Sequence, residues 1–523
     1  EGMTVFPWLT VLALLPLVGA ALLIFIKGSA AKSLSLAVSV LAFAVSLGVL
    51  FGFQPGGGMQ FTEQVTWIKP FGVHYALGVD GIGLTLVLLV TFVTPLVILA
   101  SWNDFDGGKA AWIASGNQAA PAPKYDARVF FALVLVVESL SLFVFTATDV
   151  FMFYVFFEAI LLPMYFLIGG FGGARRSYAA VKFLLFGLLG GFVMLASVVG
   201  LYVLSARAGE PSYLLSDLSQ LDIATGTGRW LFVGFMFAFA IKAPMVPFHT
   251  WLPDAAEESN PGGATMMVGL MDKIGTFGMI RFCLGLFPEA SQWATPVVLV
   301  LAVISILYGA IAAIGSRDLM RLIAYTSISH FGFMVMGIFA FTTQSMVGST
   351  LYMLNHGLST ALLFLIVGYF IKRRGSRDVF AFGGVQTNTP VAASLWMFAA
   401  LATCSLPGLS TFVSEFMVLA GTFSRHPAFA AVATVTIVLA ALYMLLMYQR
   451  TMTGPVTPEV ERTVTDDLSG RERLAIAPLV ILVLVLGFFP KPMLDVIEPA
   501  VQATMQHVGV SDPQPWVTAE GGR

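Results

Sequence analysis

A lysine interrupts one of the most apolar stretches of the chain. Lys242 follows the apolar run 230–241, and Pro244 and Pro247 come directly after it, with further apolar residues beyond. A charged side chain in membrane hydrocarbon costs about 2.5–3.5 kcal/mol on insertion scales, and each proline removes a backbone hydrogen-bond donor. A lysine near a helix end can instead snorkel to the membrane surface. The apolar sequence on both sides of Lys242 favours a functional lysine at a broken helix.

Acidic residues occur in two earlier apolar runs, and one of them suits Lys242 as a partner. Glu158 has aromatic and aliphatic neighbours on all sides, and Glu138 lies in the run before it. Burial disfavours the charged form of an isolated lysine or glutamate, whereas a nearby opposite charge stabilises both charged forms. A Glu158–Lys242 pair with a changeable spacing would therefore switch the proton affinity of each partner. The alternative is a static ion pair that joins two helices.

Further titratable residues follow in order through later apolar runs. Lys273 is a second buried lysine, His330 and His356 lie in two later runs, and Glu415 follows a second proline break. Adjacent groups that each hold a proton briefly are what a proton relay requires. A lone histidine in a membrane helix is more often a structural hydrogen-bonding group, so the prediction depends on the ordered series. Asp272 is not expected to share the helix face of Lys273.

Glu138 and His249 are secondary candidates for this series. His249 comes seven residues after Lys242 and would lie close to the same face of an unbroken helix. Haem ligation by paired histidines is disfavoured, because only three histidines lie in or near the apolar runs and no two share one run. Cys283 and Cys404 are far apart within apolar runs, so they indicate neither a disulfide framework nor a metal cluster.

Composition and motifs argue against several other functions. The sequence has no phosphate-binding loop and no dinucleotide-binding glycine motif after a strand. Any redox cofactor or ATPase must therefore lie on another chain, and we expect no cofactor and no metal on this one. The net charge of -2 argues against nucleic acid as a partner.

The apolar runs predict an all-α polytopic protein in a lipid bilayer. The chain is 58% hydrophobic and 11% charged, against about 25% charged residues in soluble domains. Runs of about 20 residues are typical of membrane helices rather than of barrel strands. The first run is too long for a signal-peptide core and is expected to be a retained span. Residues 54–80 alternate enough to form a short external hairpin. The fourteen predicted spans are 5–26, 33–53, 82–101, 129–146, 149–170, 179–205, 229–250, 263–287, 294–315, 320–341, 346–371, 391–423, 428–450 and 474–490, and an interfacial piece can extend the last of them to residue 500.

The basic residues predict the orientation of these spans. Most of the 27 lysines and arginines fall in loops that follow odd-numbered spans. Such loops stay on the inner side of a membrane. We therefore expect both termini outside, in the periplasm, with a bacterial inner membrane as the location.

The two proline breaks suggest an internal repeat. Pro244 and Pro247 interrupt the seventh span, and Pro407 interrupts the twelfth, five spans later. Interrupted helices at corresponding positions of inverted repeats indicate a transport site. We expect two inverted five-helix repeats, residues 129–287 (helices 4–8) and 294–450 (helices 9–13), with helices 1–3 in 1–128 and the last helix and tail in 451–523. The alternative is two unrelated proline kinks.

Three motifs resemble a known family. They are Lys242-Ala-Pro-Met-Val-Pro-Phe-His-Thr-Trp-Leu-Pro-Asp-Ala, the turn and helix 261–271, and Ser316-Arg-Asp-Leu-Met-Arg-Leu-Ile-Ala-Tyr-Thr-Ser-Ile-Ser-His-Phe-Gly. They resemble the signature of the antiporter-like proton-pumping subunits of respiratory complex I, which multisubunit cation/proton antiporters share. Phe157-Glu158-Ala-Ile-Leu-Leu-Pro-Met-Tyr-Phe-Leu and Glu415 are most similar to the M-type (subunit 4) chains, because the sister chains have lysine at the latter position.

The resemblance implies a fold and roles for the candidate residues. It implies fourteen helices, discontinuous seventh and twelfth helices, and a central hydrophilic axis. Glu158 and Lys242 would be the coupling pair, Lys273 the central relay, His330 and His356 intermediates, and Glu415 the outlet. Partners would be the other membrane subunits of complex I, including neighbouring antiporter-like subunits, with FMN, iron–sulfur clusters and quinone on other chains of this NADH:quinone oxidoreductase.

Three functions follow as hypotheses. The first is a proton-translocating subunit of complex I, driven by quinone reduction elsewhere in the complex and without a redox site of its own. The second is a subunit of a multisubunit cation/proton antiporter or of a membrane-bound hydrogenase. The third is a scaffold that moves nothing, which the buried charges disfavour. Copurification with flavin, iron–sulfur clusters and NADH oxidation distinguishes the first from the second.

Overall fold

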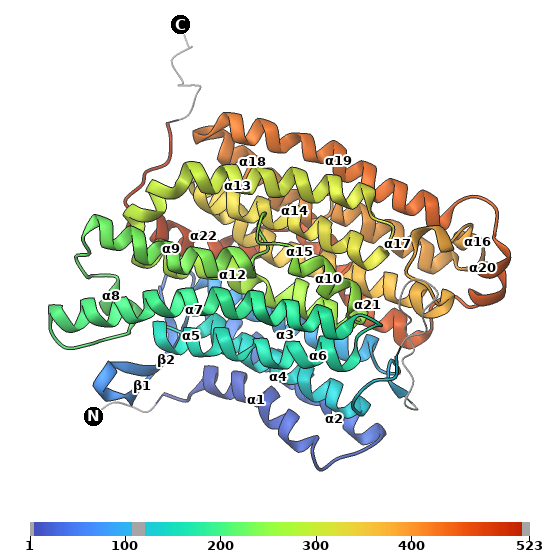
Figure 1. Cartoon of the computed structure of the whole chain (residues 1–523), viewed down its shortest axis with the longest axis horizontal. Coiled ribbons are helices and arrows are strands. Elements are labelled where there is room, and N and C mark those ends of the chain that lie inside the picture. The colour runs from blue at the N-terminus through green and yellow to red at the C-terminus, as the bar shows by residue number, and fades with distance from the viewer. Residues whose placement is uncertain (1–4, 107–120, 515–523) are drawn as a thin grey trace, which may run out of the picture.

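The computed structural model describes residues 5–106 and 121–514. Its helices run side by side along the long axis of the molecule (Figure 1). The chain begins with three helices and a hairpin: α1 (Trp8–Leu22), α2 (Ser29–Gly52), β1 (Gln60–Ile68), β2 (Val73–Val79) and α3 (Gly81–Ala100). The antiparallel hairpin lies in the segment where the alternating pattern predicts one. Some of the connection between α3 and the next helix lies outside the described residues.

The middle of the chain contains a discontinuous helix and an irregular one. Its helices are α4 (Ala127–Thr146), α5 (Val150–Ala159), α6 (Leu161–Phe171), α7 (Arg176–Ala208), α8 (Leu215–Leu218), α9 (Thr225–Lys242), α10 (Trp251–Glu258), α11 (Pro261–Ala264) and α12 (Lys273–Gly278). The predicted seventh span is broken between α9 and α10. π-Helical segments, Thr265–Met271 and Met279–Leu284, stand on either side of α12.

The second discontinuous helix lies toward the end of the chain. The helices there are α13 (Pro288–Gly315), α14 (Leu319–Phe339), α15 (Thr343–Arg374), α16 (Val385–Asn388), α17 (Pro390–Thr403), α18 (Ser410–Arg425), α19 (Pro427–Met452), α20 (Pro458–Thr463), α21 (Gly470–Phe488) and α22 (Lys491–Val508). The break between α17 and α18 contains Pro407, as predicted. α22 bends away from α21 by 70°, and it contains the stretch up to residue 500 for which the sequence predicts an interfacial piece.

Helix α15 occupies the centre of the bundle. The most apolar 18-residue stretch of α15 is completely buried. The helix packs against α14, α18, α3 and the π-helical segment Thr265–Met271. The Thr342 hydroxyl caps its start by accepting a hydrogen bond from the Ser345 N–H. Gly375, with φ 74°, ends it after Lys372, Arg373 and Arg374, where basic side chains suit the negative end of the helix dipole.

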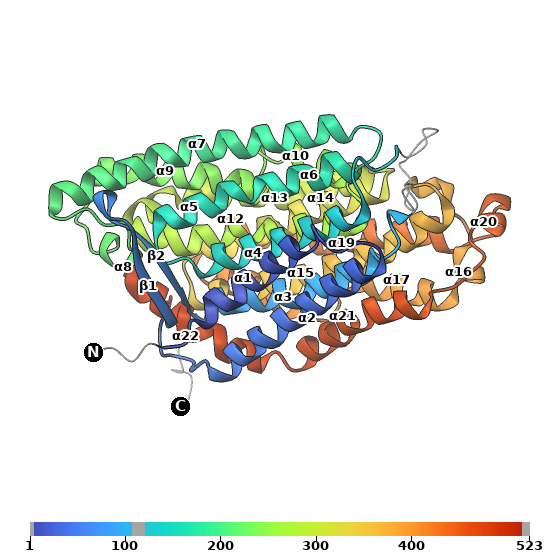
Figure 2. The same ribbon diagram turned by 90° about the horizontal axis from the view of Figure 1, so that it is seen from below.

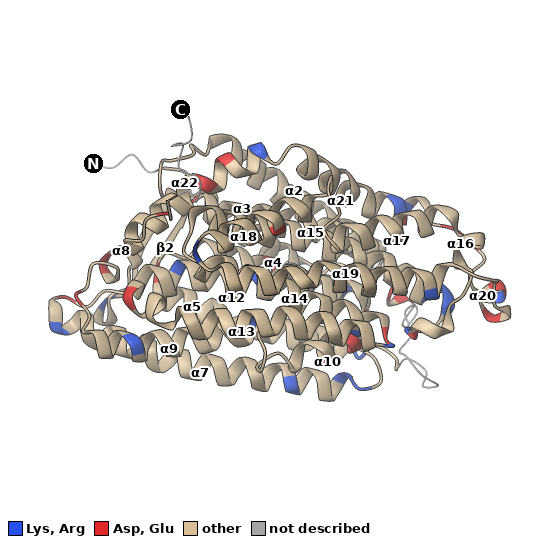
Figure 3. Cartoon of the chain, turned by 90° about the horizontal axis from the view of Figure 1, so that it is seen from above, with Lys and Arg blue, Asp and Glu red and all other residues tan. Residues whose placement is uncertain are grey.

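The charged residues and the loops separate toward two ends of the bundle. The β1–β2 hairpin, α8 and α22 lie at one end, and α16, α17 and α20 lie at the other (Figures 1 and 2). Charged residues gather near these ends, and few occur along the middle of the helices (Figure 3). Exposed apolar side chains cover the outer faces of helices such as α7, α13 and α19. This distribution is that of a multi-pass membrane protein.

The predicted all-α membrane fold is confirmed, but the number of crossings is not. Every predicted span contains helix. Among the described residues, nine helices are long and apolar enough to cross a membrane, or ten if the bent pair α21–α22 counts as one. α1 and α17 are apolar but shorter, and breaks or π-helical turns divide others. Fourteen crossings therefore stays a prediction.

Candidate functional site

Lys242 is the last residue of α9 and is 3% exposed. Its ammonium nitrogen finds no hydrogen-bond partner among the described residues and lies 4.6 Å from the centre of the Phe157 ring, a favourable position for a cation. A cavity of about 10 Å³ beside it is lined by Lys242, Phe157 and Trp251, among others, and gives room for about one water molecule. The break thus leaves a buried charge beside a small free space.

Glu158 lies near Lys242, in the last turn of α5. The two charges interact electrostatically, but within the described chain Oε1 of Glu158 has no hydrogen-bond partner. Gly191 of α7 makes room for this carboxylate, since a Cβ there would lie 1.7 Å from Oε1. The structure therefore brings the predicted pair together without locking it in a direct hydrogen bond.

Side chains from neighbouring segments satisfy the backbone at the break after Lys242. The Trp251 indole donates a 2.9 Å hydrogen bond to the Ile241 carbonyl. The Val246 N–H donates a 3.0 Å hydrogen bond to the Ser305 hydroxyl of α13. Breaks in membrane helices persist where such partners replace the lost helical bonds, so the end of α9 is held in place.

Lys273 begins α12 and is fully buried. Its ammonium group donates a 3.0 Å hydrogen bond to the Val268 carbonyl and lies 2.6 Å from Nδ1 of His356 on α15. Nε2 of His356 lies 3.2 Å from the Ser327 hydroxyl of α14. The second lysine is thus in direct contact with a histidine of the predicted series.

The polar line continues from His356 to Glu415. The rings of His356 and His330 have centroids 5.3 Å apart, and the His330 ring lies 5.8 Å from that of Tyr352. The Tyr352 hydroxyl donates a 3.0 Å hydrogen bond to Oε2 of Glu415. Lys273, His356, His330 and Glu415, all predicted from the sequence, therefore lie on one buried line, with Tyr352 between the last two.

The second break positions a hydroxyl against Glu415. The Ser405 hydroxyl donates a 2.5 Å hydrogen bond to the Glu415 carboxylate. Ser405 has φ 63°, a backbone conformation that few residues other than glycine adopt. Asn355 of α15 donates a 2.7 Å hydrogen bond to the Ser410 carbonyl at the start of α18. The break contains Pro407. The residue Ser405 before it contacts Glu415, and Ser410 after it contacts Asn355 of α15.

The two secondary candidates lie apart from this line. Glu138 of α4 is fully buried, and its carboxylate lies beside the Thr94 hydroxyl of α3. His249 lies in the break after α9 with its ring 4.9 Å from the Tyr308 ring of α13. Because the helix is broken between α9 and α10, the spacing of an unbroken helix does not apply to His249.

The sequence gives no role to three residues near the line. Tyr352 and Ser405 are not among its candidates, and Asp272 is named only as a residue that does not share the helix face of Lys273. Tyr352 precedes His356 by one helical turn, so helical spacing is the signal that could have indicated it. Ser405 carries no signal of its own, because serine is common in membrane helices. Asp272 is fully buried, and its carboxylate interacts with both Lys242 and Lys273.

A charged cluster joins the far end of the broken helix to α14. Arg321 lies 2.9 Å from Asp254 and 3.0 Å from Glu257, both on α10, and Lys182 of α7 lies 2.7 Å from Asp254. Arg321 belongs to the motif 316–332 that the sequence analysis compares with the family signature. In the structure it anchors α14 to α10 within the chain.

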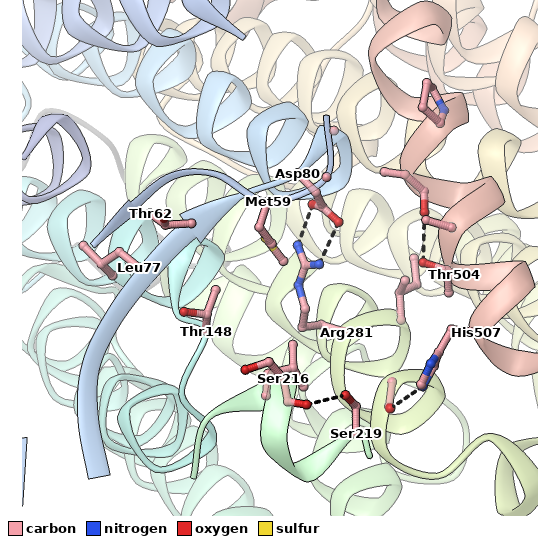
Figure 4. Close-up of a pocket in the computed structure, with 18 of the residues that line it drawn as sticks. Met59, Thr62, Leu77, Asp80, Thr148, Ser216, Ser219, Arg281, Thr504 and His507 are labelled. Carbon is pink, nitrogen blue, oxygen red and sulfur yellow. Dashed lines mark hydrogen bonds and ion pairs between the residues drawn. The ribbon is translucent and has the colours of Figure 1, made fainter. Parts of the chain in front are cut away.

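A cavity of about 570 Å³ opens at the end of the molecule that carries the hairpin and α22. Arg281 and Asp80 face each other in it with two hydrogen bonds of 2.7 and 2.6 Å (Figure 4). Asp80 also caps α3 by accepting from the Gly83 N–H. Burial opposes ionisation of Asp80, but Arg281 and the Gly83 N–H hold its pKa below the ordinary value. These paired charges line the cavity.

In residues 5–106 and 121–514, no group of three or more histidine, cysteine, aspartate or glutamate side chains is arranged to hold a metal ion. Cys283 and Cys404 are both free thiols. The chemistry that the buried line from Lys273 to Glu415 supports is the transfer of protons between buried side chains.

The fold and its buried titratable line define an antiporter-like membrane subunit. Residues 147–440 match the family described as NADH:quinone oxidoreductase/Mrp antiporter, transmembrane, and the chain belongs to this family. It is 52% identical to NADH-quinone oxidoreductase subunit M of Mycobacterium tuberculosis, over 98% of this chain and 96% of that protein. The predicted resemblance to the M-type chains is thereby confirmed.

Two solved structures share the fold. A chain of respiratory complex I from Thermus thermophilus with bound NADH matches 96% of this chain and 100% of its own length, with a TM-score of 0.85 and 31% identity. A chain of the Mrp complex from Dietzia sp. matches 97% of this chain and 100% of its own length, with a TM-score of 0.81 and 21% identity. The latter likeness concerns the fold alone.

Proposed function

We propose that this chain translocates protons as the M-type membrane subunit of an NADH:quinone oxidoreductase. It has no redox site of its own, and FMN, iron–sulfur clusters and quinone are on other subunits. Its partners are the other membrane subunits, including neighbouring antiporter-like chains. Quinone reduction elsewhere drives the proton transfers through these neighbours. The observation that carries the proposal is the buried line from Lys273 through His356, His330 and Tyr352 to Glu415.

The line gives a proton a route through the second half of the chain. Lys273 passes a proton to His356, with which it is already in contact. His330 and Tyr352 continue the route to Glu415, which is the outlet. Histidine suits the intermediate positions, because its ring nitrogens can accept a proton on one side and release one on the other.

The Glu158–Lys242 pair acts as the switch in the first half. Neither Oε1 of Glu158 nor the Lys242 ammonium has a hydrogen-bond partner among the described residues, so a small movement changes their distance without breaking a hydrogen bond of either atom. When the charges approach, Lys242 holds its proton. When they separate, burial favours the neutral amine, and the proton moves toward Lys273.

The breaks after α9 and α17 support the remaining elements of the proposal. Residues 129–287 and 294–450 are two inverted five-helix repeats, each with one discontinuous helix. The segment 1–128 precedes them and the segment 451–523 follows them. The protein resides in a bacterial inner membrane with both termini in the periplasm. Labelling of cysteines introduced near the termini with a membrane-impermeant reagent, in intact cells and in inside-out vesicles, tests this orientation.

Substitution of the switch residues tests the proposed function. In the assembled complex, Lys242→Met and Glu158→Gln should lower the number of protons pumped per NADH oxidised. Lys491→Met is the matched control, because Lys491 pairs with Asp495 on the exposed surface of α22. Normal pumping by the Lys242→Met and Glu158→Gln complexes would overturn the assignment.

The second candidate function is a subunit of a cation/proton antiporter or of a membrane-bound hydrogenase. The observation in its favour is the shared fold of the Mrp complex. Purification of the intact complex decides between the two. Flavin, iron–sulfur clusters and NADH oxidation in the purified material support the oxidoreductase, and ion exchange without them supports the antiporter.

A further inference from the structure

Asp272 is a buried carboxylate that the relay described above does not use. It is 0% exposed, and neither carboxylate oxygen finds a hydrogen-bond partner among the described residues. Buried polar side chains in folded proteins are nearly always hydrogen-bonded, and an unpaired carboxylate is far more costly to bury than a neutral group. Such a group requires a partner that compensates its charge or a role that needs its proton affinity.

The only charged side chains with which Asp272 interacts in the described chain are the two lysines of the relay. Lys242 approaches from α9, and Lys273 is the next residue of its own helix. Lys242 in turn interacts with both Glu158 and Asp272. Asp272 and Gly275 are three residues apart and share a helix face, and Gly275 packs against the backbone of Ala243, the residue after Lys242. Asp272 therefore faces the end of α9 that carries Lys242.

The local backbone explains how the adjacent residues Asp272 and Lys273 point in different directions. Consecutive residues of a helix point about 100° apart, so Asp272 does not share the face from which Lys273 contacts His356. The segment Thr265–Met271 is π-helical, and the Asp272 N–H donates to the Met267 carbonyl five residues back. π-Helical turns are rare and frequent at functional sites.

Close packing fixes Asp272 and its helix against the end of α9. A Cβ on Gly275 would lie 2.4 Å from the Ala243 backbone nitrogen, and a Cβ on Gly278 would lie 2.5 Å from the Phe239 ring. The two helices therefore approach more closely than larger residues would permit.

We propose that Asp272 is the proton carrier between Lys242 and Lys273. The inference rests on the proposed function and adds a residue to it. In the first step an N–H bond of the Lys242 ammonium breaks and an O–H bond forms on Asp272, which leaves a neutral amine and a neutral carboxylic acid. In the second step Asp272 gives this proton to the neutral amine of Lys273 and becomes a carboxylate again. Each step conserves charge. A bridging water relays the proton in each step, because the Asp272 carboxylate makes no direct hydrogen bond to either lysine within the described residues.

Low polarity makes these steps accessible. Separated charges are expensive in a dry interior, and a buried ion pair often gains little over its neutral counterpart. Transfer within the Lys242–Asp272 pair exchanges two charges for two neutral groups. A change in the position of Glu158, which competes for Lys242, therefore shifts the balance between the two forms.

Asp272→Asn in the assembled complex tests the proposal, because asparagine keeps the size of aspartate and cannot carry the proton. The variant should lose as much proton pumping per NADH oxidised as Lys242→Met does, while NADH oxidation with an artificial electron acceptor is unchanged. Asp495→Asn on exposed α22 is the matched control and should pump normally. Asp272→Glu restores a carboxylate and should recover pumping relative to Asp272→Asn.

Infrared difference spectroscopy adds a readout that a purely structural role would not move. The C=O stretch of a protonated carboxylic acid should appear during turnover in the wild type, shift in Asp272→Glu and be missing in Asp272→Asn. If the Asp272→Asn complex does not assemble, the position of the C=O band in Asp272→Glu tests whether residue 272 is protonated during turnover. Normal pumping by Asp272→Asn, or an unshifted band in Asp272→Glu, overturns the role of Asp272. If Lys242→Met also pumps normally, the proposed function itself fails.

Discussion

Gly191 on α7 provides the space that the Glu158 carboxylate occupies. A Cβ at this position would lie 1.7 Å from Oε1 and 2.2 Å from the carboxyl carbon, so alanine must displace the carboxylate. We expect Gly191→Ala to reduce proton pumping, because Glu158 would leave its position near Lys242. Pumping per NADH oxidised measures the effect, with Gly48→Ala as the control because nothing lies within 4 Å of a Cβ there. Equal pumping in both variants would contradict a positional role for Glu158.

The Tyr352 hydroxyl is the contact between the histidines and Glu415. Tyr352→Phe keeps the ring and removes the hydrogen bond to the carboxylate, which at a charged group contributes about 1.5–3 kcal/mol. We expect slower proton release and a lower pumping ratio. Tyr448→Phe is the control, because its hydroxyl bonds to Gln386 at the exposed end of α19. A Tyr352→Phe complex that pumps like the wild type would remove Tyr352 from the route.

The sequence predicts the residues of the line better than the connections between them. Lys242, Lys273 and Glu415 stand out because charge in an apolar run is costly. Tyr352 and Ser405 carry no charge and do not stand out. Asp272 cannot share a helix face with Lys273, which argues against it in the sequence, yet this difference in direction is what lets it interact with Lys242.

At the scale of elements, the contact between α12 and the end of α9 depends on glycine. A Cβ on Gly275 would lie 2.4 Å from a backbone nitrogen and 2.8 Å from the Phe239 carbonyl oxygen, and backbone atoms cannot rotate away. We expect Gly275→Ala to cost about 1–3 kcal/mol through overpacking and to lower the thermal stability of the purified complex. Gly226→Ala, at the open start of α9, is the control. Equal stability of the two variants would show that the close approach is not required.

The Asp80–Arg281 pair joins the start of α3 to the helix that carries Lys273. The folded-state pKa of Asp80 is below the ordinary value, so the ionised pair stabilises the fold above the pKa of the unfolded chain, about 3.9. This stabilisation is lost as the pH falls through the folded-state pKa. Asp80→Asn leaves Arg281 without its carboxylate partner and should cost about 3–5 kcal/mol at neutral pH.

Thermal unfolding of the wild type and Asp80→Asn as a function of pH measures this effect. The difference in melting temperature should be full at neutral pH and should shrink only under strongly acidic conditions. A difference that does not depend on pH, or no difference at all, would contradict a stabilising ion pair.

Proline explains the predicted breaks, and also one division of a helix that the sequence analysis does not predict. The predicted span 149–170 is one span of 22 residues in the structure, Val150–Phe171, with a single turn residue, Ile160, between α5 and α6. Pro163 accounts for this, because a proline ring clashes with the carbonyl four residues earlier, here that of Ala159. The π-helical turns around α12 have no comparable signal, because they depend on how that helix packs against α9 and α15.

At the scale of the whole molecule, composition and the length of the apolar runs are sufficient to predict the membrane fold. The number of crossings is harder to predict, because breaks and bends such as that between α21 and α22 leave helices too short to count by length alone. The order of the polar line depends on contacts between helices far apart in sequence, such as that between α15 and α18. These contacts come from tertiary packing, which a single sequence does not display.

The most direct test of proton translocation through this chain is the number of protons pumped per NADH oxidised by a complex with Lys273→Met. Methionine keeps an unbranched side chain of similar reach and removes the charge that contacts His356. We predict a lower ratio than in the wild type and in the Lys491→Met control, with NADH oxidation by an artificial electron acceptor retained. A wild-type ratio in the fully assembled Lys273→Met complex would contradict a proton route through this chain.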